Sequence, residues 1–175
     1  MKYCKKEIKK VYISEEKIKS KIKQLAKKIT KDYKDKDLVV VCVLRGSIMF
    51  VCDLIRQIDL PLEVDFFWVK SYEETETSGS VRVLKKPDSN LKNRDVLLVD
   101  DILDTGYTFE KTIAEIQKYN PKSLKIAAFL DKPSRRLIDI KLDYCGFVIP
   151  NEFVVGYGLD FRQKYRNLPY IGVMK

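Results

Sequence analysis

Short apolar runs that do not alternate with polar residues constrain the fold of this chain most strongly. Leu38–Leu44, Asp95–Val99 and Leu124–Leu130 are typical of strands buried on both faces, and helical segments at Ile48–Ile58 and Thr108–Tyr119 separate them. This alternation predicts an α/β fold with a mainly parallel sheet and helices on both faces, which binds ligands beyond the carboxyl ends of its strands. Shorter strands are expected at Leu62–Val69, Val81–Leu84, Gly146–Ile149, Phe153–Val155 and Tyr170–Met174.

The positive charge of the chain is concentrated in its first 37 residues. This segment holds fourteen lysines and six acidic residues, whereas the whole chain has a net charge of +9. Within it, Ile18, Ile22, Leu25 and Ile29 recur at helical spacing after a candidate N-cap at Ser14. The lysines form either the solvated face of this helix or a nucleic-acid patch. Because arginine and interleaved aromatic residues are absent from the stripe, we favour the solvated face and do not expect a nucleic-acid partner.

The residues that are missing from the chain exclude several kinds of chemistry. There is no histidine, which rules out a Ser-His-Asp triad, a Cys-His pair and imidazole ligands for zinc. The four cysteines contain no C-x-x-C pair and favour a reducing, cytoplasmic compartment. The longest apolar run, Leu38–Leu44, is far shorter than the roughly 20 residues that span a bilayer, so no membrane association is expected. The 175 residues suit one domain.

The most informative segment joins the expected strand at Asp95–Val99 to the helix at Thr108–Tyr119. Two carboxylates, Asp100 and Asp101, follow the strand, and a turn from Asp104 to Thr108 then contains a glycine and two threonines. Free N–H groups at a helix N-terminus, hydroxyl groups and a glycine are typical of a phosphate-monoester site. Acidic residues beside a phosphate group are costly unless they meet hydroxyls or a metal ion, and a ribose diol with Mg²⁺ supplies both.

This turn has two other interpretations. Asp104 or Thr105 could only cap the following helix, although capping explains one acidic residue and not three within five positions. The Asp104-Thr105-Gly106 triplet also resembles that of aspartic proteases. Such an enzyme needs two triplets, so this chain would have to act as a homodimer.

The acidic pair and the D-T-G-x-T turn resemble the phosphoribosyl pyrophosphate signature of type I phosphoribosyltransferases. Over nearly the whole chain, the sequence is most similar to the hypoxanthine-guanine phosphoribosyltransferases. Four further segments match in the order of the family. Leu44–Ser47 resembles its pyrophosphate loop, and Ser71-Tyr72 resembles the start of its mobile lid. Asp131–Arg136 and Phe153–Asp160 resemble its two purine-recognition segments, and Arg166 follows shortly after them. The resemblance implies one domain over residues 1–175, with a small hood built from the terminal segments.

The resemblance also implies a reaction and a role for each matching residue. The reaction transfers phosphoribosyl from phosphoribosyl pyrophosphate to N9 of a 6-oxopurine, with Mg²⁺ as cofactor. Asp104 is implied as the catalytic group that exchanges a proton with purine N7, and Asp100 and Asp101 hold the ribose hydroxyls and help to place Mg²⁺, with Asp160 facing a second ion. The 5′-phosphate is assigned to Asp104, Thr105, Gly106, Tyr107 and Thr108. Pyrophosphate is assigned to Leu44, Arg45, Gly46 and Arg166, and the purine to Lys132, Phe153, Val154 and Asp160.

Several alternatives stay open at this level. An RNA-binding regulator resembling the pyrimidine-operon attenuation proteins would have the same fold, and an enzyme preferring xanthine would have similar motifs. Lys132 donates hydrogen bonds but does not accept them, which favours a carbonyl at purine C6 over the amino group of adenine. By resemblance to the family, a homodimer or a homotetramer is expected.

Overall fold

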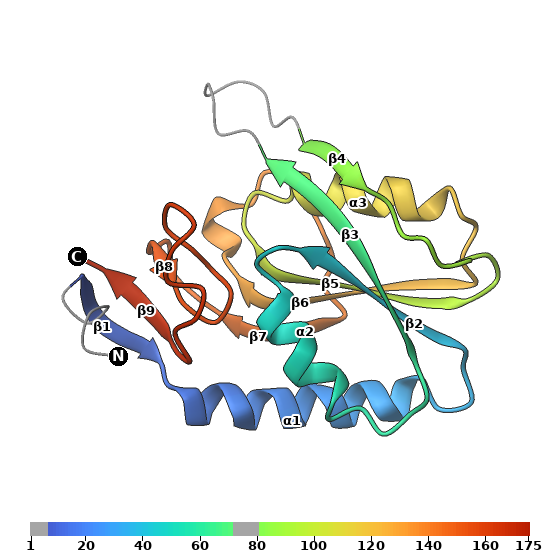
Figure 1. Ribbon diagram of the computed structural model, residues 1–175, viewed down its shortest axis with the longest axis horizontal. Helices are drawn as coiled ribbons and strands as arrows, with labels where there is room; N and C mark the ends of the chain where they lie inside the picture. Colours follow the sequence, from blue (N-terminus) through green and yellow to red (C-terminus); the bar gives the residue numbers. More distant parts are fainter. Residues whose placement is uncertain (1–6, 72–80) are drawn as a thin grey trace.

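The apolar runs form the central sheet of the fold. The computed structural model describes residues 7–71 and 81–175. Within them, six strands lie in the order β4-β3-β2-β5-β6-β7, and all neighbours are parallel except β3 and β4 (Figure 1). The mainly parallel sheet predicted from the sequence is therefore confirmed. Its strands are β2 (Leu38–Leu44), β3 (Glu63–Ser71), β4 (Val81–Lys85), β5 (Asp95–Leu103), β6 (Ser123–Asp131) and β7 (Tyr144–Val148).

Helices cover both faces of this sheet, which explains why the central strands are apolar throughout. Along β2, alternate residues enter two different hydrophobic clusters: Val40 belongs to the cluster shared with α1 (Glu15–Asp32) and α2 (Ile48–Ile55), and Val41 to the cluster shared with α3 (Tyr107–Gln117). Since successive side chains point to opposite faces of a strand, burial on both sides requires an unbroken apolar run. Figure 1 shows α1 and α2 on one side of the sheet and α3 on the other.

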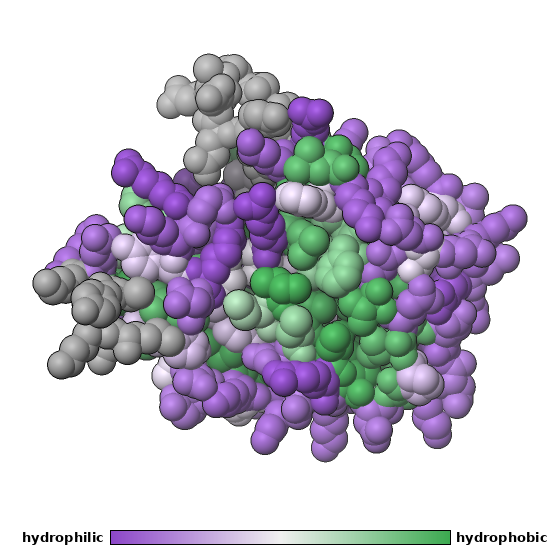
Figure 2. Space-filling model, in the orientation of Figure 1, coloured by the Kyte–Doolittle hydropathy of each residue, from purple (hydrophilic) through white to green (hydrophobic). Residues whose placement is uncertain are grey.

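Helix α1 has the amphipathic arrangement that its sequence predicts. The Ser14 side chain accepts a hydrogen bond from the Lys17 N–H at 3.4 Å and caps the helix. The lysine face is exposed, and hydrophilic residues line the edge of the molecule over α1 in Figure 2. The buried face is formed by Ile18, Ile22, Leu25, Ala26 and Ile29.

A smaller sheet is built from the two terminal segments, as the resemblance implied. Strand β1 (Ile8–Ile13) pairs antiparallel with β9 (Ile171–Met174), which also pairs with β8 (Val154–Val155). Figure 1 shows this sheet at one end of the molecule. Strand β1 was not predicted, because its sequence Ile-Lys-Lys-Val-Tyr-Ile mixes lysines with apolar residues and its pairing partner lies at the other end of the chain.

Two element boundaries differ from those expected by three or more residues, and one short helix was not predicted. Helix α2 ends at Ile55 rather than Ile58, and a short 3₁₀ helix at Pro133–Arg135 was not predicted. Strand β5 continues to Leu103, four residues beyond the expected end at Val99, because β6 pairs with it as far as the Leu103–Asp131 position. The acidic pair therefore lies within the strand and not beyond it.

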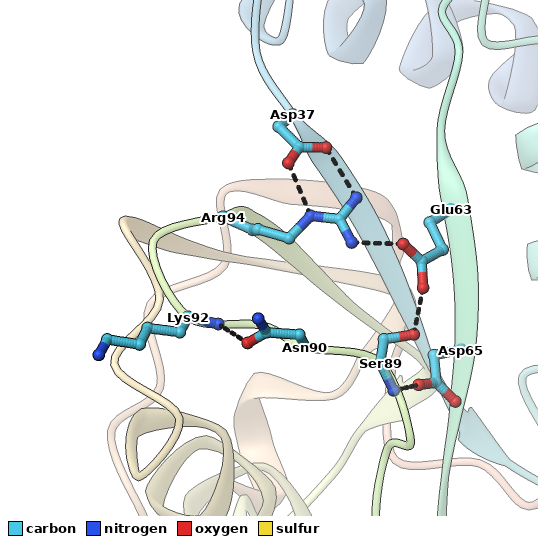
Figure 3. Close-up of polar contacts among 7 residues, drawn as sticks. All are labelled: Asp37, Glu63, Asp65, Ser89, Asn90, Lys92 and Arg94. Carbon is cyan, nitrogen blue, oxygen red and sulfur yellow. Dashed lines mark hydrogen bonds and ion pairs between the residues drawn. The ribbon is translucent and has the colours of Figure 1, made fainter.

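Arg94 joins the amino ends of three neighbouring strands (Figure 3). Its guanidinium donates two hydrogen bonds to Asp37, at 2.8 and 2.7 Å, and pairs with Glu63 at the start of β3. Ser89 donates to both Glu63 and Asp65 and extends the network. Bidentate guanidinium–carboxylate pairs are among the stronger polar contacts, so this network holds β2, β3 and β5 in register at the edge opposite their carboxyl ends.

We expect Arg94→Met to lower the free energy of unfolding by about 1–2 kcal/mol near neutral pH. Hydrogen bonds from Arg94 and Ser89 hold the pKa of Glu63 below its ordinary value of 4.5. The stabilisation is therefore complete above that value and is lost as the pH falls below it. Urea titrations at about pH 7 and about pH 3 measure both effects, with Arg82→Met on the exposed face of β4 as the control. An equal loss at the two pH values would contradict the prediction.

Candidate active site

A cavity of about 570 Å³ lies where β2, β5 and β6 end. The residues predicted to bind phosphate, pyrophosphate, ribose, metal and purine all line this cavity, although they come from segments far apart in the chain. Of the two residues predicted to begin the lid, Ser71 is the last residue of β3, and Tyr72 lies outside the described residues. The predicted residues that the structure brings together are Leu44, Arg45, Gly46, Asp100, Asp101, Asp104, Thr105, Gly106, Tyr107, Thr108, Lys132, Phe153, Val154, Asp160 and Arg166.

The turn between β5 and α3 leaves the start of α3 without a side-chain cap. Gly106 occupies the N-cap position in a left-handed conformation, with φ at 101°, and no side-chain cap is present at this end of the helix among the described residues. A Cβ atom at this position would lie 2.8 Å from the Ile138 carbonyl oxygen, so both the conformation and the packing require glycine. The alternative in which Asp104 or Thr105 only caps the helix is therefore wrong, and the positive end of α3 faces the cavity.

Of the acidic pair beside this turn, Asp100 is buried and Asp101 is half-buried. Asp100 is 6% exposed and accepts a hydrogen bond from the Asp101 N–H at 2.8 Å. Burial raises the pKa of both carboxyl groups, and the neighbouring Asp101 raises that of Asp100 further. Arg166 partly offsets the shift in the pKa of Asp101. A cation or hydroxyl donors in the cavity would stabilise the ionised forms of these two groups.

Mg²⁺ fits the donor set that this pair offers. The described residues contain no cluster of three or more acidic or thiol side chains that could enclose a metal ion. Mg²⁺ needs no such cluster, because it keeps waters and is commonly held by one or two carboxylates together with substrate phosphates. Asp100 and Asp101 supply two carboxylates on the cavity wall. Asp160 fits less directly, since its oxygens contact Arg166 at 2.6 Å and the Gln163 N–H at 2.8 Å.

Two glycines allow three backbone segments to meet at the acidic pair. A Cβ atom on Gly46 would lie 1.6 Å from Asp101 Oδ2, and a Cβ atom on Gly158 would lie 1.9 Å from the Gly46 carbonyl oxygen. Gly158 also has a positive φ of 102°. The Leu44–Arg45 peptide bond that precedes Gly46 is cis. The loop after β2 is thus packed between β5 and the segment around Gly158, with no room for a side chain at either contact.

Asp104 lies beside a pair of arginines. Arg135 Nε donates to Asp104 Oδ1 at 2.9 Å, and Arg136 Nε donates to the Asp104 carbonyl oxygen at 3.0 Å. Both arginines belong to the segment that resembles a purine-recognition motif, but only Lys132 was assigned a role from the sequence. The sequence analysis identified the segment Asp131–Arg136 but not the contacts of its arginines. Those contacts follow from the packing of the 3₁₀ helix at Pro133–Arg135 against the turn between β5 and α3.

Lys132 and Phe153 line the cavity in different ways. Lys132 is 7% exposed, and burial lowers the pKa of its ammonium group. Phe153 is 56% exposed, while the adjacent Val154 and Val155 are buried. Phe153 therefore lies at the cavity wall and not in the hydrophobic core. Its ring packs edge-to-face on Phe161, with 5.7 Å between the ring centroids, which orients an aromatic surface at the cavity wall.

Two contacts of Arg45 were not predicted. Its guanidinium lies over the Trp68 ring, 5.1 Å from the centroid, and donates to Gln163 Oε1 at 3.1 Å. Trp68 is the only tryptophan of the chain and precedes the segment resembling the lid. These two features do not indicate that it contacts Arg45. No feature of the sequence distinguished Gln163.

Known proteins resemble this chain over nearly its whole length. Residues 12–162 match the family described as the phosphoribosyl transferase domain. The hypoxanthine-guanine phosphoribosyltransferase of Staphylococcus epidermidis is 50% identical over 171 residues, which are 97% of this chain and 96% of that protein. The enzyme of the same name from Bacillus subtilis is 46% identical, with coverage of 97% and 94%.

Solved structures agree with this result. A crystal structure of a hypoxanthine phosphoribosyltransferase from Staphylococcus aureus has a TM-score of 0.94 and 47% identity, covering 98% of this chain and 94% of that one. A mutant of the hypoxanthine phosphoribosyltransferase from Trypanosoma cruzi, in a ternary substrates complex, has a TM-score of 0.91 and 38% identity, with 97% of each chain covered. These matches do not favour the RNA-binding regulator as an alternative.

We expect Gly46→Ala to impair anion binding at this cavity without unfolding the protein. The new methyl group would collide with Asp101 Oδ2 and force that carboxylate to move. Isothermal titration with inorganic pyrophosphate and Mg²⁺ should show affinity reduced by about tenfold or more. Gly172→Ala is the control, because its Cβ atom would meet only the side chains of Ile8 and Tyr170. Unchanged affinity in Gly46→Ala would contradict the prediction.

Proposed function

This chain belongs to the hypoxanthine-guanine phosphoribosyltransferases, a family of transferases in purine salvage, and we propose that it transfers 5-phosphoribosyl from phosphoribosyl pyrophosphate to N9 of hypoxanthine or guanine. The products would be IMP or GMP and pyrophosphate. One observation carries the proposal: a single cavity contains the uncapped helix start, the acidic pair and the group formed by Lys132 and Phe153. These three parts match a phosphate, a ribose and a purine.

The 5′-phosphate is assigned to the start of α3. The first turn of a helix offers unpaired N–H groups and a positive dipole end, and Gly106 lets a ligand approach the backbone closely. Hydroxyl groups of Thr105 and Thr108, both on the cavity wall, add donors. The pyrophosphate group is assigned to Leu44, Arg45, Gly46 and Arg166, where two guanidiniums and the main chain of the loop after β2 are available.

Asp100 and Asp101 are assigned to the ribose hydroxyls and to Mg²⁺, with Asp160 as a further carboxylate for a second ion. Bound Mg²⁺ would neutralise the charge of the departing pyrophosphate. The raised pKa values of the acidic pair support this assignment, because a carboxyl group that is costly to ionise alone becomes a good ligand once a cation or hydroxyl donors reach it. Arg166 carries further positive charge at the leaving group.

Asp104 is assigned to proton exchange with purine N7. Its Oδ1 is held by Arg135, which fixes the carboxylate on the cavity wall and leaves its second oxygen to face a ligand. A carboxylate at this position would stabilise positive charge that develops on the purine, and would accept or return the N7 proton. The chain has no histidine to take this role.

Lys132 and Phe153 are assigned to the purine base. The exposed ring of Phe153 offers a stacking surface. The main chain at Val154 and Asp160 lies beside the same wall and is assigned to the edge of the base. The ammonium group of Lys132 donates to a carbonyl at C6. Adenine carries an amino group at C6, whose N–H donors would face the N–H donors of Lys132 without an acceptor between them.

Homodimer or homotetramer formation is part of the proposal. Figure 2 shows apolar side chains gathered over α2 and the adjacent part of β3. Met49 of α2 is 39% exposed and Phe66 of β3 is 36% exposed. A continuous apolar patch of this kind is typical of a surface that a protein partner covers.

A cytoplasmic location is also proposed. Cys42, Cys52 and Cys145 are unpaired, as expected in a reducing compartment. No helix among the described residues is both long and apolar enough to cross a membrane.

We expect Asp104→Asn to lower kcat for hypoxanthine by about 10²- to 10⁴-fold, because the amide cannot exchange a proton with N7. An ultraviolet assay with phosphoribosyl pyrophosphate, Mg²⁺ and each purine measures the effect. Asp139→Asn is the matched control, since Asp139 is exposed and does not line the cavity. Unchanged turnover in Asp104→Asn would remove this residue from the chemistry but leave the function in place. No turnover of any 6-oxopurine by the unsubstituted protein would refute the function.

We expect kcat/KM for adenine to be at least about 10³-fold below that for hypoxanthine, since a site built to donate to a carbonyl leaves its donor unpaired beside an amino group. The same assay, with the purines offered separately and in competition, measures this ratio and ranks hypoxanthine, guanine and xanthine. Adenine turnover comparable to that of hypoxanthine would contradict the role of Lys132. Faster turnover of xanthine than of the other two would identify a xanthine-preferring enzyme.

A further inference from the structure

Two guanidinium groups at the cavity share a single hydrogen-bond acceptor. Arg45 Nη1 and Arg166 Nη2 both donate to Gln163 Oε1, at 3.1 and 3.2 Å. Arg45 belongs to the loop after β2, and Arg166 lies 121 residues further along the chain. Like charges that approach one another repel, and more strongly where water is partly excluded. An oxygen that accepts from both groups offsets this repulsion and sets their separation.

The backbone of Gln163 is fixed in a tight turn. Its N–H donates to Asp160 Oδ2 at 2.8 Å, and its φ is 63°, in the left-handed region. Phe161 and Lys164 on either side exchange two backbone hydrogen bonds, at 3.1 and 3.0 Å. The amide oxygen therefore projects from an ordered turn, although the side chain is exposed.

Each guanidinium also has contacts of its own, and that of Arg166 pairs with Asp160 Oδ1 at 2.6 Å. Arg45 stacks over the Trp68 ring, and Arg166 Nη1 donates to the Gly158 carbonyl oxygen at 2.7 Å. These contacts tie each arginine to a different segment. Gln163 is the described side chain that hydrogen-bonds to both, and so couples the loop after β2 to the segment that follows β8.

We propose that Gln163 is a positioning residue, which aligns Arg45 and Arg166 on the pyrophosphate group of the substrate and product. This inference rests on the proposed function, because it takes the two arginines as the pyrophosphate ligands. Two guanidiniums held before the substrate arrives lose less rotamer freedom on binding. The side-chain oxygen of Gln163 accepts from the two arginines, and only its main chain contacts Asp160. Replacing the side chain should therefore affect phosphoribosyl pyrophosphate and pyrophosphate while leaving the base unaffected.

The test compares three variants with the unsubstituted enzyme. Gln163→Met has the length of glutamine without an acceptor oxygen, and Gln163→Glu retains acceptor oxygens at the same reach. Gln57→Met makes the first substitution at an exposed position outside the cavity. For each protein, steady-state kinetics give KM for phosphoribosyl pyrophosphate, KM for hypoxanthine and the inhibition constant of pyrophosphate. Thermal unfolding reports whether each variant is folded.

In Gln163→Met we expect KM for phosphoribosyl pyrophosphate and the inhibition constant of pyrophosphate to rise by about tenfold. KM for hypoxanthine should change by less than about twofold, and Gln163→Glu should restore most of the loss. The inference would be overturned if Gln163→Met and the unsubstituted enzyme had equal KM values for phosphoribosyl pyrophosphate and equal inhibition constants for pyrophosphate. Equal impairment of Gln163→Met and Gln163→Glu would also overturn it, and so would a parallel rise in KM for hypoxanthine. Absence of transfer by the unsubstituted enzyme would instead refute the proposed function itself.

Discussion

The placement of two adjacent carboxyl groups in a central strand, one buried and one half-buried, is the constraint on which the site depends. Asp100 and Asp101 lie in β5, which pairs with β2 and β6 and is covered by helices on both faces. Burial raises the pKa of both groups, since the charged forms lose hydration. The surrounding structure therefore has to offer cations or donors at the carboxyl end of β5, or leave these groups protonated.

The packing around the pair follows from this constraint. Asp101 occupies the space where a side chain of residue 46 would stand, and the Gly46 carbonyl occupies the space beside Gly158. These contacts bring the loop after β2 and the segment after β8 against the acidic pair. Arg45 and Arg166 arrive with those segments at the cavity wall, and the positive charge of Arg166 acts on Asp101. A polyanionic substrate and the acidic pair can then share one cavity, because each faces groups of opposite charge.

Much of the fold was predictable because its signals are local. An unbroken apolar run indicates a strand buried on both faces, and the stripe of Ile18, Ile22, Leu25 and Ile29 indicates the buried side of α1. The predictions failed where pairing is not local. Strand β1 depends on β9 at the other end of the chain, and β5 continues through its acidic residues because β6 supplies hydrogen bonds that far. The sequence around these residues carries no sign of either partner.

The sequence by itself determined which residue types are available for chemistry: carboxylates in place of histidine, a glycine and threonines before a helix, and a lysine after a strand. It also placed them at the ends of expected strands, since local apolar patterns mark where strands stop. Only the tertiary structure decided which of them meet. Contacts such as Arg135 with Asp104, Arg45 with Trp68, and Gln163 with two guanidiniums join residues many positions apart. Their geometry depends on loop packing, which local propensities do not encode.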